Sequence, residues 1–223
     1  MCGRFYIDHD ANAFFADGLQ SCRNRDGFIL SRRADATPVD VRPMYTATVI
    51  ANNRRHELTA FPMQWGYHLE NGRLLINVRS ETAAQKAMFA ENLRLRRCAV
   101  PLSGYYEWRQ SGRERMKYAP HPENHSPVIL AGLYRMEEQR PVFTILTREA
   151  APGIAHIHHR MPVLLSRADA AQWLHPAADA EQIMMRASIL VQPSLLEGTE
   201  PLFDMFPMDS EEGIPAGRGE IYL

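Results

Sequence analysis

Alternating hydrophobic and polar positions along the middle of the chain predict a fold rich in β-strands. Two β-prone runs, 46–51 and 57–63, are joined through the polar segment 52–55, a pattern typical of a hairpin. More runs of strand character follow at 98–108, 128–136, 142–147 and 161–165. Because these runs succeed one another without regular alternation with helices, we expect an α+β fold. It would hold a mainly antiparallel, curved sheet with flanking helices.

Helical spacing of apolar residues is confined to a few segments. It predicts a short helix at 14–19, after a possible N-cap at Asp10, and a longer Ala-rich helix at 82–95. The residues of the longer helix available for burial are Ala84, Met88 and Leu95. Ser166 and Asp179 stand where N-caps would, so they predict helices ending near residues 174 and 186.

Length and composition indicate one globular domain. The chain has 223 residues, of which 45% are hydrophobic, so we expect a single domain over 1–208 and an acidic, Gly- and Pro-containing tail over 209–223. No apolar run approaches the roughly 18 residues of a membrane span, and charges interrupt the first twenty residues where a secretory signal would be apolar. We therefore expect a monomer that is cytoplasmic and nucleoid-associated, without a membrane partner. Three cysteines, Cys2, Cys22 and Cys98, form no even disulfide framework, which agrees with a reducing compartment.

The net charge of −1 hides an asymmetry between the halves of the chain. Residues 1–117 hold 18 Lys and Arg against 12 Asp and Glu, whereas residues 118–223 hold 7 against 14. Most of the cations are arginines, whose guanidinium forks suit phosphate oxygens. The basic half therefore favours a nucleic-acid partner, although clustered arginines also occur as an ordinary solvated surface.

Cys2, directly after Met1, is the residue with the most distinctive chemistry. Removal of Met1 would leave a cysteine with both a free α-amine and a thiol. The amine can condense with an aldehyde to a Schiff base, and the thiol can then close a five-membered thiazolidine on the same carbon. The alternative is that Cys2 is an ordinary small residue at the start of a strand.

Four separated blocks give this cysteine a context. They are MCGRF at 1–5; WGY at 65–67 leading to NVRSET at 77–82; RCAVP at 97–101 leading to GYYEW at 104–108; and IHHRMP at 157–162. In this order they resemble the motifs of the SOS-response-associated peptidase (SRAP) family, and the resemblance covers residues 1 to about 175. Four matching blocks in series are far more specific than any one of them.

The resemblance implies a protein that acts on abasic sites in single-stranded DNA. It implies a covalent crosslink between the N-terminal cysteine and the ring-opened sugar aldehyde, with no metal or other cofactor expected, and the family name also records a proposed peptidase activity. The matching catalytic residues are Cys2, Asn77, Glu107 and His158. The residues expected to contact DNA are Arg4, Trp65, Gly66, Arg79, Glu81, Thr82, Arg97 and Arg160.

The residue chemistry is consistent with these roles. A carboxyl group at Glu107, among aromatic neighbours, is expected to have a raised pKa, and the imidazole of His158 is expected to titrate near neutrality, so both could move protons. Local positive charge is expected to activate the Cys2 thiol. Unpaired bases are gripped by stacking, and the aromatic candidates are Trp65, Tyr67, Tyr105 and Trp108.

Two other functions use overlapping residues. The α-amine of Cys2 could serve as the base for its own thiol in an N-terminal-nucleophile hydrolase that acts on amides. A metal-binding module could use His156, His158 and His159, since His156 and His158 would share one face of a strand. The chain also departs from the family motifs: His159 replaces an aspartate, and residues 35–38 and 206–210 match only loosely.

Overall fold

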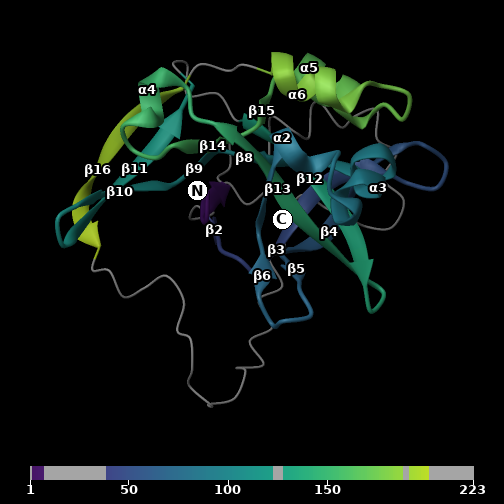
Figure 1. Ribbon diagram of the computed structural model, residues 1–223, viewed down its shortest axis with the longest axis horizontal. Helices are drawn as coiled ribbons and strands as arrows, with labels where there is room; N and C mark the ends of the chain where they lie inside the picture. The colour runs from purple at the N-terminus through teal and green to yellow at the C-terminus, as the bar shows by residue number, and fades with distance from the viewer. Residues whose placement is uncertain (1, 8–38, 123–127, 188–190, 201–223) are drawn as a thin grey trace.

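A computed structural model describes residues 2–7, 39–122, 128–187 and 191–200 of the chain, and Figure 1 shows its elements. The largest sheet has eight strands, in the order β14-β13-β4-β3-β8-β12-β15 with β7 beside β13. These strands are β3 (Thr46–Asn52), β4 (Leu58–Trp65), β7 (Asn77–Arg79), β8 (Arg97–Leu102), β12 (Val128–Glu137), β13 (Arg140–Glu149), β14 (Arg160–Pro162) and β15 (Leu164–Leu165).

The sheet curls because β12 pairs with β13 as well as with β8 and β15. The order of paired strands therefore returns to β13, and the sheet forms a partial barrel. All pairings in this sheet are antiparallel except those of β13 with β4 and β7. The expected α+β class with a mainly antiparallel, curved sheet is confirmed, and so is the hairpin of β3 and β4, in which Val49 pairs with Phe61.

Two smaller sheets contain the first and the last strands of the described residues. The first has the order β2-β1-β9, formed by β1 (Phe5–Ile7), β2 (Val39–Val41) and β9 (Gly104–Tyr105). The second contains β10 (Glu107–Ser111), β11 (Glu114–His121) and β16 (Gln192–Glu200), and it forms a wing at one side of the barrel (Figure 1). A hairpin of β5 (Tyr67–His68) and β6 (Leu74–Leu75) completes the strands. Because β1 pairs with β9, the start of the chain lies against the segment that leads to β10.

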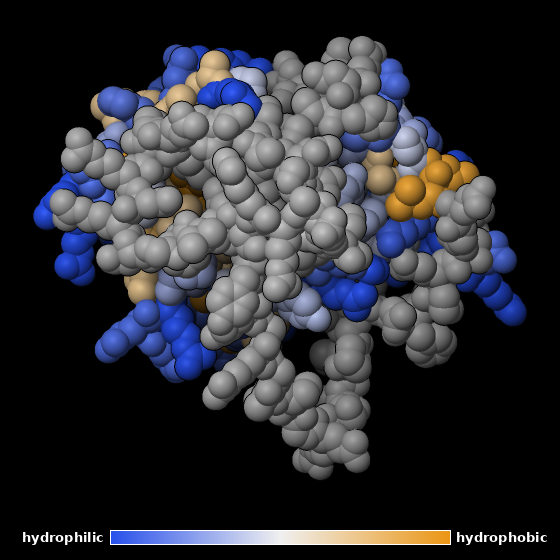
Figure 2. Space-filling model, turned by 180° about the vertical axis from the view of Figure 1, so that it is seen from behind, coloured by the Kyte–Doolittle hydropathy of each residue, from blue (hydrophilic) through white to orange (hydrophobic). Residues whose placement is uncertain are grey.

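Aromatic side chains fill the core between the first small sheet and the barrel. The Phe5 and Trp65 rings lie 5.1 Å apart, and Trp65 stacks on Phe143 at 6.2 Å. All three side chains are fully buried, and each such burial stabilises the fold by roughly 1.5–3 kcal/mol. Seen from behind, the described surface is mostly hydrophilic with small apolar patches (Figure 2).

The helix expected at 82–95 is broken, and the prediction of its buried face was wrong. The structure has α2 (Ser80–Ala83), a turn, and α3 (Ala87–Leu95). The break changes the helical phase, so α3 buries Phe89, Asn92 and Leu93. Ala84 is only partly buried, while Met88 and Leu95 are exposed.

The helices that follow the barrel begin where their caps predicted. In α5 (Arg167–Leu174) the Ser166 side chain accepts a hydrogen bond from the Asp169 amide, and in α6 (Ala180–Arg186) Asp179 accepts two. The two helices lie side by side over one end of the sheet (Figure 1). Trp173 of α5 is fully buried and donates to the Cys98 carbonyl of β8 at 2.9 Å, which fixes α5 to the barrel. A short α4 (Pro152–Ala155) precedes β14.

Several sequence predictions lie outside the described residues. These are the helix at 14–19, the loosely matching segments 35–38 and 206–210, and the boundary between a domain ending at 208 and a tail. Among the described residues, no helix has both the length and the apolar character that crossing a membrane requires.

Candidate active site around Cys2

The cysteine that the sequence singled out is fully buried just before β1. Its carbonyl oxygen accepts a 2.7 Å hydrogen bond from Asn77 Nδ2, and its Sγ lies 4.0 Å from the Arg4 carbonyl oxygen. Burial, with a further contribution from the charge of Glu107, raises the pKa of the Cys2 thiol well above its ordinary value. The expectation that positive charge activates this thiol is therefore wrong for the free protein, and the thiol needs a proton acceptor to react.

Glu107 supplies a carboxyl group beside this thiol. It begins β10, and its side chain is only 2% exposed. Burial raises the pKa of Glu107 from an ordinary 4.5 to about 7, as the sequence predicted. A carboxyl group with this pKa exchanges a proton readily at neutral pH, so it can act as an acid and as a base in one reaction.

Asn77 reaches Cys2 because β7 runs parallel to β13, with Asn77 opposite Ile145. The side chain is 9% exposed, and its amide nitrogen is used by the Cys2 carbonyl. Its Oδ1 is buried and accepts no hydrogen bond from the described residues. That oxygen can therefore accept a hydrogen bond from a group that enters the site.

His158 is held in a single neutral form. Its Nδ1 accepts a 2.9 Å hydrogen bond from the Arg160 backbone amide, which places the ring proton on Nε2, and its ring stacks on His159 at 4.5 Å. Burial above all, and then the positive charge of the amino terminus with smaller contributions from His159 and Arg160, lowers the pKa of His158 to about 4. The expectation that this imidazole titrates near neutrality is wrong, and His158 can offer a neutral N–H donor instead.

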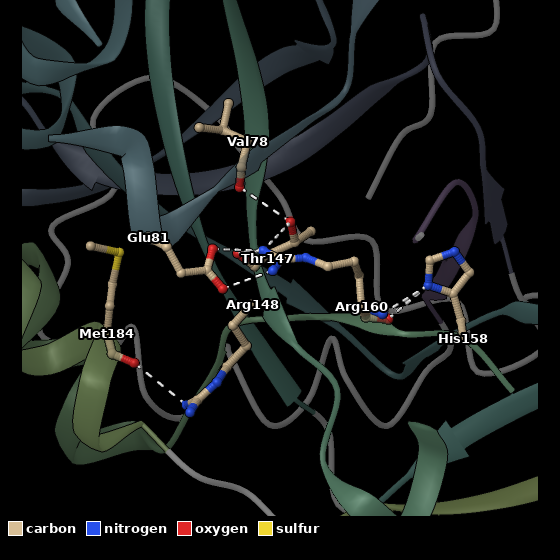
Figure 3. A network of polar contacts seen from close by, with 7 residues as sticks. All are labelled: Val78, Glu81, Thr147, Arg148, His158, Arg160 and Met184. Carbon is tan, nitrogen blue, oxygen red and sulfur yellow. Dashed lines mark hydrogen bonds and ion pairs between the residues drawn. The ribbon is translucent and has the colours of Figure 1, made fainter. Parts of the chain in front are cut away.

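Arg160 and Glu81, both expected at the DNA interface, bind each other. Two parallel hydrogen bonds of 2.7 and 2.8 Å join the guanidinium to the carboxylate, and Arg160 also donates to the Thr147 carbonyl at 2.6 Å (Figure 3). These hydrogen bonds lower the pKa of Glu81 to about 2. The Arg160 backbone amide also orients His158, which lies two residues before β14, so the Arg160–Glu81 pair connects the start of β14 to α2.

Three further expected DNA contacts are part of the interior, and this corrects the sequence prediction. Trp65 is fully buried and donates to the Ile76 carbonyl at 3.0 Å. Gly66 is buried at a φ of +121°, where a Cβ would meet Leu74 at 2.6 Å. Arg97 is buried, and its guanidinium donates to five backbone carbonyls, those of Leu93, Arg94, Trp173, His175 and Pro176. None of these side chains is available to a nucleic acid.

The remaining expected contacts stay at the surface. Arg79 is exposed at the end of β7, directly before α2, and among the described residues its guanidinium forms no hydrogen bond or ion pair. Thr82 is partly exposed. Arg4 forms an ion pair with Asp40 while its guanidinium lies 5.7 Å from the centre of the Tyr106 ring.

Sequence reasoning named only Arg4 and Trp108 from a row of rings and cations beside Glu107, which we call the aromatic strip. Its members are Arg4, Tyr6, Tyr106, Trp108, Arg115 and Lys117. Neighbouring rings lie 5.1 Å (Tyr6–Tyr106) and 6.2 Å (Tyr106–Trp108) apart, and the Lys117 ammonium sits 4.2 Å from the centre of Tyr106. The sequence contained a signal for this strip. Successive side chains of a strand point to opposite faces, so a buried Glu107 implies that Tyr106 and Trp108 face the other way.

The other candidate aromatic residues and the metal-site alternative are not supported by the structure. Tyr67 and Tyr105 are fully buried, so neither offers a face for a stacked base. His156 caps α4 instead of sharing a strand face with His158, so the geometry assumed for a metal module was wrong. Within the described ranges, no three His, Cys, Asp or Glu side chains are placed to hold a metal ion.

An open cavity of about 250 Å³ lies between α3 and α6, away from Cys2. Ala84, Leu93 and Asp179 are among its lining residues, and no residue of the Cys2 cluster is. Because Cys2 itself has no exposed surface among the described residues, a substrate has to displace neighbouring atoms to reach the thiol.

Comparisons with known proteins place this arrangement in a family. The family model described as SOS response associated peptidase (SRAP) matches residues 1–197. A Bacillus subtilis protein named abasic site processing protein YoqW is 30% identical over 187 residues, covering 79% of this chain and 81% of that protein. The Escherichia coli abasic site processing protein YedK is 27% identical over 183 residues, covering 78% of this chain and 79% of YedK.

A solved structure supports the same fold. The crystal structure of a phage-related protein from Bordetella bronchiseptica matches with a TM-score of 0.69 at 21% identity. The match covers 88% of this chain and 95% of that one.

Proposed function

Because the chain belongs to the SRAP family, we propose that it processes abasic sites in DNA, and that it does so by attaching itself covalently to the ring-opened site in single-stranded DNA through Cys2. The observation that carries this proposal is the contact set of Cys2. The residue is held by Asn77 and lies beside a carboxyl group whose pKa is about 7. An aldehyde is the electrophile that an N-terminal cysteine is suited to trap.

The reaction requires two bonds to one carbon. After Met1 is removed, the α-amine of Cys2 adds to the aldehyde carbon of the opened sugar, and the carbinolamine takes up a proton and loses water to give an iminium. The Cys2 thiol then adds to that carbon and releases a proton, which closes a thiazolidine. The aldehyde oxygen leaves as water, and no oxidant or reductant is required.

Glu107 is suited to both proton transfers. With its pKa near 7, the protonated carboxyl group can deliver the proton that removes water, and the resulting carboxylate can accept the proton of the thiol. This acceptor matters because burial keeps the Cys2 thiol protonated. His158 contributes a neutral N–H donor, since its pKa is about 4. Asn77 holds the backbone of the nucleophile at 2.7 Å while its free Oδ1 can accept a hydrogen bond from the α-amine.

The aromatic strip and Arg79 form the proposed DNA-binding surface. Tyr106 and Trp108 are partly exposed, and each stacked base contributes roughly 1–3 kcal/mol to single-strand binding. Lys117 and Arg115 lie over these rings, where they can also approach phosphates. Duplex DNA hides its base faces, so this surface favours single strands.

The proposal is tested by mixing processed protein with a single-stranded oligonucleotide that carries one abasic site and measuring the intact mass of the product. We expect one covalent adduct per chain, with the loss of one water. Cys2→Ala should form no stable adduct, whereas Cys98→Ala, which alters a second buried cysteine, should still crosslink. Cys2→Ser keeps the amine, so it should give an adduct only when borohydride reduces the iminium.

Two results would contradict the proposal. A full yield of stable adduct from Cys2→Ala would remove the cysteine from the chemistry. Turnover of peptides or simple amides by the wild-type protein, without an adduct on abasic DNA, would favour the N-terminal-nucleophile hydrolase instead.

A further inference from the structure

Tyr105 is a fully buried tyrosine whose hydroxyl forms no hydrogen bond within the part of the chain that the structure describes. The side chain has no exposed surface, and among the described residues the hydroxyl has no hydrogen-bond partner. A buried polar group without a partner destabilises a fold, and phenylalanine would fill the same space without that penalty. Such a hydroxyl is available to a partner that arrives from outside.

The backbone holds Tyr105 rigidly against the chain start. Tyr105 pairs with Phe5 across β9 and β1, and the next amide, that of Tyr106, donates to the Arg4 carbonyl at 2.9 Å. The preceding Gly104 packs so tightly on the Tyr6 ring that a side chain there would collide with it. The Tyr105 ring therefore cannot move to bring its hydroxyl into water.

The hydroxyl belongs to the same cluster as Cys2 and Glu107. Tyr105 and Glu107 are two residues apart in extended chain, so their side chains lie on the same side, and both are buried. Burial first, and then the charges of Glu107 and Cys2, raise the pKa of Tyr105 well above its ordinary value. The phenol is therefore neutral at all working pH values and can donate a hydrogen bond but cannot act as a base.

We propose that the Tyr105 hydroxyl is a further catalytic residue, which donates a hydrogen bond to the oxygen on the sugar carbon attacked by Cys2. This inference rests on the proposed crosslinking function. The oxygen starts as the aldehyde oxygen and becomes the carbinolamine hydroxyl that leaves as water. A fixed donor would hold it beside Glu107, which supplies the departing proton.

Tyr105 would then supply a hydrogen-bond donor to the site, and Asn77 would supply an acceptor. The buried Asn77 Oδ1, which also lacks a partner among the described residues, is an acceptor suited to the Cys2 amine. The Tyr105 hydroxyl is a donor suited to the aldehyde oxygen. The two unsatisfied atoms thus match the nucleophile and the electrophile of the first step.

The test compares Tyr105→Phe with wild type and with the control Tyr67→Phe. Tyr67 is also fully buried, but the groups around its hydroxyl are Cys98, Asn92 and Arg135 rather than the site. Three quantities are measured for each protein: the rate of adduct formation at saturating abasic single-stranded DNA, the Kd for an oligonucleotide of the same sequence without the lesion, and the melting temperature.

We expect Tyr105→Phe to form the adduct about three- to tenfold more slowly, with a Kd within about twofold of wild type and an equal or higher melting temperature. Tyr67→Phe should crosslink at the wild-type rate. An unchanged rate in Tyr105→Phe would overturn the inference, and so would a slower rate accompanied by a lower melting temperature, because the hydroxyl would then be structural. A wild-type protein that forms no adduct would refute the proposed function itself, which separates the two failures.

Discussion

Replacing Glu107 by glutamine should make the protein more stable at neutral pH while it impairs the chemistry. Glutamine keeps the size of the side chain and resembles the protonated carboxyl group, but it cannot ionise. Glu107 is 2% exposed, so solvent does not screen the effect of its charge. The expected gain in the free energy of unfolding follows from the pKa that burial imposes on this group.

The magnitude and sign follow from proton linkage. The pKa of Glu107 is about 7 in the folded protein and an ordinary 4.5 when it is exposed. Below pH 4.5 the carboxyl group is protonated in both the folded and the unfolded state. Its titration therefore does not change the free energy of unfolding in this range. Between pH 4.5 and 7 the unfolded state releases the proton first, so stability falls as pH rises. The full loss above pH 7 is about 3 kcal/mol, since one pKa unit corresponds to 1.36 kcal/mol.

Urea denaturation of wild type and Glu107→Gln, measured at intervals from pH 4 to 8, checks this prediction. The difference in unfolding free energy should rise by about 3 kcal/mol in favour of the variant between pH 4.5 and 7.5, whatever its value at pH 4. Adduct formation by the variant should be slower than by wild type. A difference that stays constant across this pH range would show that Glu107 is not buried as a high-pKa carboxyl group, and its proposed proton transfers would lose their basis.

Four other substitutions separate DNA contacts from structural roles. Arg79→Ala should lower the log–log salt slope of single-strand binding by about 0.7 and change the free energy of unfolding by less than about 0.5 kcal/mol, measured by binding titrations and denaturation. Arg97→Ala should lower the free energy of unfolding by about 2–4 kcal/mol, because five backbone carbonyls lose their donor. Denaturation and the salt slope of DNA binding are both measured, and a change in binding without a change in stability would contradict this. Trp108→Ala should weaken binding by about 1–3 kcal/mol with no loss of adduct yield at saturating DNA. His158→Ala should slow adduct formation without altering the pH profile between 6 and 8, since the pKa of His158 is about 4; a shifted profile in stopped time courses would contradict the neutral assignment.

Local signals in the sequence were sufficient for the elements that depend on local chemistry. The β3–β4 hairpin and the N-caps Ser166 and Asp179 were all predicted, because turn and cap preferences act within a few residues. The buried face of α3 could not be predicted. A break of three residues after α2 shifts the helical phase, and residues 84–86 contain no glycine or proline that would have signalled it.

The candidate site was predictable as a set of positions but not as an arrangement. The resemblance of the motif blocks to the SRAP family pointed to Asn77 and Glu107, and the structure places both next to Cys2. The roles of the other residues depend on burial, and a sequence motif carries no information on burial. Burial turns Trp65 into a core residue, lowers the pKa of His158, and raises the pKa of Tyr105.

The arginines show most clearly why net charge was a weak guide to the proposed DNA-binding surface. A guanidinium carries five N–H donors, so it can hold several backbone carbonyls or a carboxylate as easily as a phosphate. Arg97 uses its donors on the end of α5, and Arg160 uses its fork on Glu81 and Thr147. The basic excess of the first half therefore stabilises the fold in part, and the cations that we propose for DNA binding are those that stand over rings or at the exposed end of β7. A binding surface of this kind depends more on stacking than on charge, so its affinity should fall less steeply with salt than the count of arginines implies.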